Sequence, residues 1–147
     1  MSIIMSKSDM IGKLLIAVPA FMAVSAIIDY SFTIWLSGTE ENLIRNEFSP
    51  LLVYAVRNDV MIPYFLFTVI FYFSASYFAL KMLSSDKQLF YSASAILILI
   101  SVAHTFGGFS WYIKSEAYSN AILAISAIAI MMAIFLSGWS ILQKKSI

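Results

Sequence analysis

Four long stretches of mainly apolar residues, separated by short polar segments, dominate the pattern of this chain. Each is about 23 or 24 residues long, and together they cover residues 14–36, 60–83, 89–111 and 119–142. As an α-helix with a rise of 1.5 Å per residue, each stretch reaches roughly 35 Å, which exceeds the thickness of a hydrocarbon core, about 30 Å. The pattern therefore predicts four membrane-spanning helices.

The polar segments predict where these helices begin and end. Gly38 is expected to end the first span, and residues 39–45 are expected to form a charged loop. Ser49 and Pro50 are residue types favoured at a helix cap and first turn, so they predict a short apolar helix over residues 51–56 at the membrane interface. Two polar turns are expected at the remaining connections, residues 84–88 and 114–120.

The composition places the chain in the membrane class, because 61% of its 147 residues are hydrophobic and only 12% are charged. We therefore predict an all-α integral membrane four-helix bundle that forms a single domain over residues 1–147, as a multi-pass protein of the plasma membrane. The first apolar stretch is too long for a signal-peptide core of about 7–15 residues, so we expect an uncleaved span. The absence of cysteine excludes disulfides and thiolate metal sites.

Basic residues predict the orientation in the membrane. Six of the nine lie on the side of the termini: Lys7, Lys13, Lys81, Lys87, Lys144 and Lys145. By the positive-inside rule, both termini are expected in the cytoplasm and the short interfacial helix in the first outer loop. The outer side then carries most of the acidic residues, Glu40, Glu41, Glu47, Asp59 and Glu116.

Asp29 lies deep inside the first apolar stretch, where a carboxylate costs roughly 2.5 to 3.5 kcal/mol and needs a partner or a proton. Ser25, Asp29 and Thr33 are spaced four residues apart and share one helix face. A second polar stripe follows the third span, with members Ser94, Ser101, His104, Gly108 and Trp111.

Asp29 and His104 are expected at similar depths, roughly 10 Å below the outer edge of the apolar zone, so we predict that they meet. Around Asp29, Thr33 and His104 an outward-opening polar pocket is expected. Its predicted supports are Glu47, Ser49, Asp59 and Tyr112. Two interpretations stay open: a buried polar clasp that fixes helix register, or a site for a proton, an ion or a substrate.

The remaining residue types do not indicate a specific binding or catalytic site. Aromatic residues crowd the second span, where packing and lipid contact explain them, and Trp35, Trp111, Trp139, Tyr64 and Tyr112 are expected to form an interfacial belt. A lone histidine cannot supply the ligands of a zinc or bis-histidine haem site, so we expect no metal, no cofactor and no catalytic residues. No motif indicates nucleotide or nucleic-acid binding.

One local pattern resembles a known family. Asp29 and Thr33, one helical turn apart, are followed by Glu47-Phe48-Ser49-Pro50. This arrangement resembles an uncharacterised family of small prokaryotic multi-span membrane proteins, in which Asp-x-x-x-Thr precedes Glu-x-Asn-Pro. Ser49 stands where that pattern has Asn. The resemblance implies a shared polar site on the outer side and names no ligand.

The small residues Ala129, Ala133 and Ser137, spaced four apart on the fourth span, predict a surface for close helix packing. With the lipid bilayer, other membrane subunits or a second copy of the chain are the expected partners. We therefore predict a non-catalytic accessory subunit of a membrane complex. The alternatives are a small proton- or cation-linked carrier or channel that uses Asp29 and His104, and an intramembrane enzyme.

Overall fold

The computed structural model describes residues 7–145, with side chains described for residues 9–141. Over this range all regular elements are helices: α1 (Lys7–Ser37), α2 (Glu40–Asn46), α3 (Pro50–Arg57), α4 (Met61–Leu83), α5 (Lys87–Ile113) and α6 (Glu116–Lys145). α1, α4, α5 and α6 are long and apolar enough to cross a membrane. The chain is thus a multi-pass membrane protein, and its four long helices extend a few residues beyond most of the predicted limits.

Local sequence explains how the first connection folds. Gly38 has φ of +74°, and α1 ends directly before it, as predicted. The prediction of a loop over residues 39–45 is wrong, because these residues include most of α2. The Thr39 side chain accepts a hydrogen bond from the backbone N–H of Asn42, and Glu40 and Glu41 stabilise the positive end of the helix dipole.

Two more helix starts, those of α3 and α6, also depend on single polar side chains. Ser49 accepts a hydrogen bond from the backbone N–H of Leu52 and Pro50 follows it, which confirms the predicted short helix as α3. The polar turn predicted over residues 114–120 is wrong, because α6 already begins at Glu116. Here the Ser115 hydroxyl accepts a hydrogen bond from the backbone N–H of Tyr118 and caps the helix.

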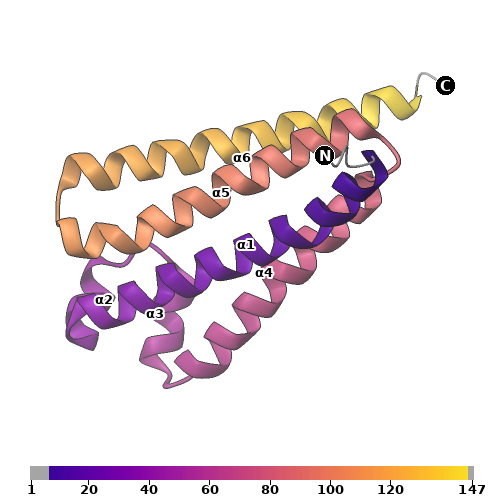
Figure 1. The fold of residues 1–147 in the computed structure, drawn as a ribbon. Coiled ribbons are helices and arrows are strands. Elements are labelled where there is room, and N and C mark those ends of the chain that lie inside the picture. The colour runs from indigo at the N-terminus through magenta and orange to yellow at the C-terminus, as the bar shows by residue number, and fades with distance from the viewer. Residues whose placement is uncertain (1–6, 146–147) are drawn as a thin grey trace, which may run out of the picture.

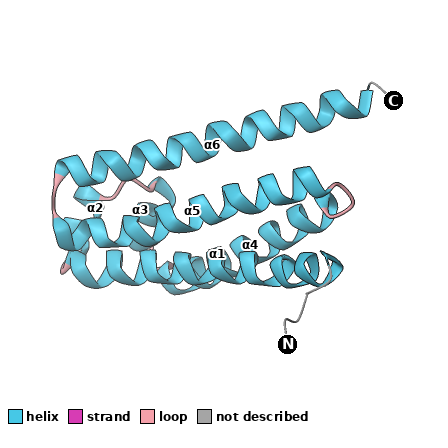
Figure 2. Ribbon diagram, turned by 45° about the horizontal axis from the view of Figure 1, so that its top comes forward, coloured by secondary structure: helices cyan, strands magenta, loops and turns pink. Residues whose placement is uncertain are grey.

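α1 is the central helix of the bundle. It packs along α5 on one side and α4 on another, while α4 and α5 have only a small contact with each other. The backbone of α6 approaches α5 alone in the part of the chain that the structure describes, and Figure 2 shows α6 on the opposite side of α5 from α1 and α4. The described backbones of α1 and α6 are therefore not in close contact with each other.

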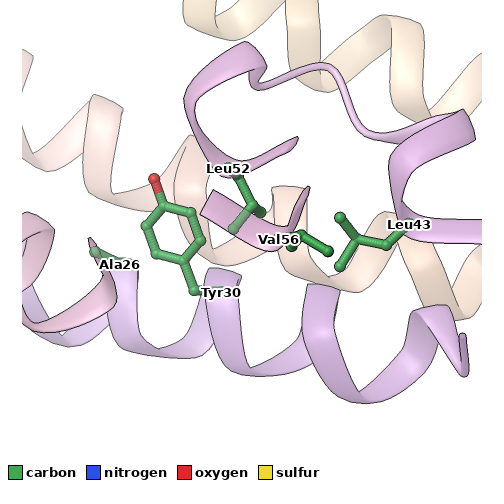
Figure 3. Packing of buried hydrophobic residues seen from close by; sticks show 5 residues of the cluster. All are labelled: Ala26, Tyr30, Leu43, Leu52 and Val56. Carbon is green, nitrogen blue, oxygen red and sulfur yellow. The ribbon is translucent and has the colours of Figure 1, made fainter. Parts of the chain in front are cut away.

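α2, α3 and the α5–α6 turn lie together at one end of the bundle, whereas α1 begins and α6 ends at the other (Figure 1). We call the first of these the α2–α3 end. A buried apolar cluster fixes α2 and α3 against α1 there, and Figure 3 shows its members: Ala26, Tyr30, Leu43, Leu52 and Val56. A second cluster, Val18, Leu80, Phe90 and Ala93, joins α1, α4 and α5 toward the opposite end.

Gly108 lets α1 and α5 cross closely beside Asp29. A Cβ atom at residue 108 would lie 2.9 Å from the Asp29 Cα and 3.2 Å from the Phe32 Cβ. Any larger residue would push the two backbones apart, since carbon atoms pack at about 3.5 to 4.0 Å. The absence of a side chain thus sets the helix separation where the polar residues meet.

Candidate functional site

The Asp29 and His104 side chains meet between α1 and α5, as the two polar stripes predicted. The Asp29 Oδ2 atom lies 2.7 Å from the His104 Nδ1 atom. An ionised carboxylate only accepts hydrogen bonds, so against an ionised Asp29 the donor is the His104 Nδ1–H. The contact therefore joins a group that can carry a negative charge to one that can carry a positive charge.

This pair is not sealed between the helices. The Asp29 side chain is 20% exposed and the His104 side chain 23%, and both residues line a cavity of about 820 Å³. The cavity lies between α1, α2, α5 and α6, and we call it the α1–α6 cavity. Its polar lining residues are Asp29, Thr33, Asn42, Asn46, Glu47, His104, Ser110, Lys114, Ser115, Glu116, Ser119, Asn120 and Ser126.

Gly107 keeps the Asp29 carboxylate open to this cavity. It lines the cavity, and a Cβ atom at residue 107 would lie only 3.3 Å from the Asp29 Oδ1 atom. A side chain here would cover the carboxylate oxygen that does not face His104. Consecutive glycines thus have different roles: Gly108 lets the backbones approach, and Gly107 exposes the charge.

Glu47 projects from the segment after α2 and brings a second carboxylate to the cavity. Burial raises the pKa of Glu47, and the nearby charge of Asp29 raises it further. Hydrogen bonds donated by the backbone N–H groups of Ser49 and Phe48 and by the Trp111 indole oppose this rise without cancelling it. The Ser49 N–H lies 2.8 Å from Glu47 Oε1 and holds this carboxylate in place.

On its α4 side, His104 contacts Tyr72, which leads to two further tyrosines. The Tyr72 ring lies 5.2 Å from the imidazole ring, centroid to centroid. The Tyr72 hydroxyl interacts with that of Tyr30, which lies 3.1 Å from the Tyr64 hydroxyl. Tyr64 therefore has a polar partner inside the bundle, in addition to the interfacial position that its place in the sequence predicted.

Some of the predicted supports of the pocket line the cavity in the structure, and others do not. Thr33 and Glu47 line the α1–α6 cavity, and Ser49 acts through its hydrogen bond to Glu47 without lining it. Tyr112 does not line this cavity, and its side chain is 74% exposed. Tyr112 directly follows Trp111, and neighbouring residues on a helix point in different directions. Asp59, in the α3–α4 turn with φ of +56°, does not line the cavity either.

The three residues of the predicted packing stripe on α6 differ in burial. Ala129 is completely buried where α6 packs on α5, Ala133 is half-buried, and Ser137 is exposed. Ser137 also satisfies its hydroxyl locally, by donating to the Ala133 carbonyl. Close packing at the first position thus occurs within this chain, and contact with another subunit at the other two stays a prediction.

Several lining residues were missed by the sequence reasoning. Asn42 was assigned to a loop and Asn46 was given no role, and their spacing of four residues was the available signal of a helix face. Trp111 was placed on the polar stripe of His104 and in the interfacial belt but was not assigned to the pocket, and it lines the cavity and interacts with Glu47. Lys114 and Glu116 were read only as outer charges. Over the described residues, no group of three His, Asp or Glu side chains has the arrangement of a metal site.

Comparison with known proteins adds no relative: no protein-family model matches the chain, and no curated protein or solved structure is similar to it. The resemblance around Asp29, Thr33 and Glu47 therefore stays a prediction.

Proposed function

We propose that this membrane protein is a small proton-linked carrier that binds a cation from the outer side at Asp29 and His104. The observation that carries the proposal is the exposure of this hydrogen-bonded pair to the α1–α6 cavity. A clasp that only fixes helix register needs no access from a cavity. A carrier requires that access, because its ionisable group must exchange with the aqueous phase.

The chemistry of the pair supplies the link between cation and proton. With Nε2 of His104 unprotonated, the pair is negative and attracts a cation; with Nε2 protonated, the imidazolium neutralises Asp29 and the attraction is lost. The other titratable groups that face His104 or share its cavity are Tyr72, Glu47, Lys114 and Glu116. We propose further that the α2–α3 end is the outer end and both termini are cytoplasmic, from the distribution of basic residues.

Proton movement in liposomes tests this proposal. Protein is reconstituted with a trapped pH dye, and gradients of sodium, potassium, tetramethylammonium and benzyltrimethylammonium are imposed in turn. We expect at least one cation to drive proton counter-movement in the wild type, and Asp29→Asn to abolish it. Asn keeps the shape and an acceptor oxygen for Nδ1–H but removes the charge.

Stability separates a functional loss from a folding defect. We expect Asp29→Asn to remain folded with a modest loss, and Asp29→Leu, which leaves His104 without its partner, to cost on the order of 1 to 3 kcal/mol. If no cation in the panel moves protons in an Asp29-dependent way, the carrier proposal is wrong and the clasp interpretation replaces it.

A second candidate is the accessory subunit of a larger membrane complex. The observation that favours it is the peripheral position of α6, which packs against α5 alone in the described chain and exposes large apolar side chains such as Met131 and Phe135. Replacing Ala133 with Leu is expected to reduce association with other subunits if this side of α6 is an interface. Purification in mild detergent measures this association. An unchanged complex would mean that this side of α6 contacts lipid and not another subunit.

A further inference from the structure

We propose that the ligand of the α1–α6 cavity is a lipophilic organic cation, a molecule with an ammonium group and an apolar body. This inference rests on the proposed function and adds the chemical class of its substrate. The volume of about 820 Å³ is in the range of small-molecule sites, roughly 300 to 1,000 Å³. Three properties of the lining select the class: charge, aromatic surface and apolar walls.

Charge favours a cation. Three carboxylates line the cavity, from Asp29 on α1, Glu47 after α2 and Glu116 on α6, whereas Lys114 is the one lysine or arginine among the described lining residues. The carboxylates come from separate parts of the chain and converge on one space. Since Gly107 leaves the Asp29 carboxylate uncovered, a cation in the cavity can approach it directly.

Aromatic surface favours an ammonium group over a hydrated metal ion. Trp111 and Phe48 are lining residues of the cavity, as Glu47 is, and the Trp111 side chain interacts with the Glu47 carboxylate. Ammonium groups are attracted to the faces of aromatic rings, most strongly to tryptophan. A carboxylate beside an indole is the combination that such ligands use.

The remaining walls favour an apolar body on the ligand. Toward the middle of the spans the lining becomes aliphatic, with Ile100 on α5 and Ile122, Leu123 and Ile130 on α6. From Lys114 to Ile100 the cavity follows α5 for roughly 21 Å. Alkali and alkaline-earth ions bind through oxygen ligands and gain nothing from such a surface.

Trp111 provides a direct binding signal. The chain has three tryptophans, so replacing Trp35 and Trp139 by Phe leaves Trp111 as the single reporter. In this background, reconstituted in nanodiscs, we titrate benzyltrimethylammonium and follow the fluorescence. Tetramethylammonium has the charge without the ring, and phenylmethanesulfonate has the ring with the opposite charge. We expect saturable binding of benzyltrimethylammonium, at least roughly tenfold tighter than either comparison compound.

Matched substitutions locate the binding. Ser126→Phe fills the cavity from α6 and should abolish binding, whereas Ala127→Phe, on the adjacent exposed residue that does not line the cavity, should leave it unchanged. Glu47→Gln should weaken binding roughly tenfold, and Glu40→Gln, which removes a carboxylate outside the cavity, should not. Glu47→Gln keeps an oxygen that accepts from the Ser49 N–H, so we expect it to fold. It therefore tests binding even if Ser126→Phe fails to fold.

The outcomes distinguish this inference from the carrier proposal. Equal binding of phenylmethanesulfonate or of tetramethylammonium, or equal effects of the Ser126 and Ala127 variants, would overturn the ligand class. If sodium or potassium drives Asp29-dependent proton movement while benzyltrimethylammonium does not bind, the carrier stands and the ligand class is wrong. If benzyltrimethylammonium binds through Asp29 and no cation of the panel moves protons, the ligand class stands and the carrier proposal is wrong.

Discussion

The close crossing of α1 and α5 makes Gly108→Ala a sharp test of the fold at the site. A Cβ atom there would meet the Asp29 Cα at 2.9 Å and the Asp29 carbonyl oxygen at 3.2 Å. Reaching a normal carbon–carbon distance of about 3.5 Å requires a backbone shift of roughly 0.6 Å. Overpacking of this kind costs about 1 to 3 kcal/mol, and backbone contacts cannot be relieved by rotating a side chain.

Alanine also brings a gain that must be separated from this cost. In a helix interior, Ala is more favourable than Gly by about 0.5 to 1 kcal/mol. Gly138 on α6 has no atom within 4 Å of a Cβ position, so Gly138→Ala isolates that gain. We expect Gly108→Ala to be less stable than Gly138→Ala by the overpacking cost, about 1 to 3 kcal/mol.

Unfolding by SDS titration in mixed micelles measures these free energies. Gly107→Ala should fall between the two variants, because its Cβ would meet the Asp29 carboxylate at 3.3 Å, and a side chain can move. Equal stability of Gly108→Ala and Gly138→Ala would refute the reasoning, since it would mean that α1 and α5 are not in close contact at Asp29.

Two further predictions concern Glu47 and topology. Because the pKa of Glu47 is raised above its ordinary value of 4.5, the folded state holds this proton more tightly than the unfolded state, so stability should fall as pH rises from about 4.5 through the raised pKa. Thermal unfolding of wild type against Glu47→Gln at a series of pH values checks this, and parallel curves would contradict it. For topology, single cysteines at Glu41 and Lys13 should be labelled from the outside and from the cytoplasm, respectively; the reverse result would invert the proposed site.

Much of this fold follows from residue type and spacing alone. The four spans could be predicted because each apolar stretch matches the bilayer in length, and Gly38 and Ser49 marked helix ends through local chemistry. α2 was missed because its charged residues look like a loop until the Thr39 cap is considered. A seven-residue helix has too little apolar periodicity to be recognised without that cap.

The site was predictable only in part. Two polar stripes at similar depth were enough to bring Asp29 and His104 together. The cavity was not predictable, because it arises from the position of α6 against α5 alone, which depends on helix packing rather than on any local pattern. For the same reason the sequence could not show that Trp111, placed on the polar stripe and in the interfacial belt, lines this cavity while its neighbour Tyr112 does not.

The most direct test of the central claim is whether water from the outer side reaches the cavity beside Asp29. The chain has no cysteine, so Ser126→Cys, a nearly isosteric change on the cavity wall, and Ala127→Cys, on the adjacent exposed residue, can be labelled without background. Position 126 lies roughly 15 Å along α6 from its start, and a charged thiol reagent reaches it only through an aqueous path. We predict that a membrane-impermeant cationic methanethiosulfonate added outside labels Ser126→Cys. It should not label Ala127→Cys, because residue 127 lies outside the cavity lining on a membrane-spanning helix and is expected to face lipid. Failure to label Ser126→Cys from outside, or equal labelling of both positions, would contradict an outward-open site.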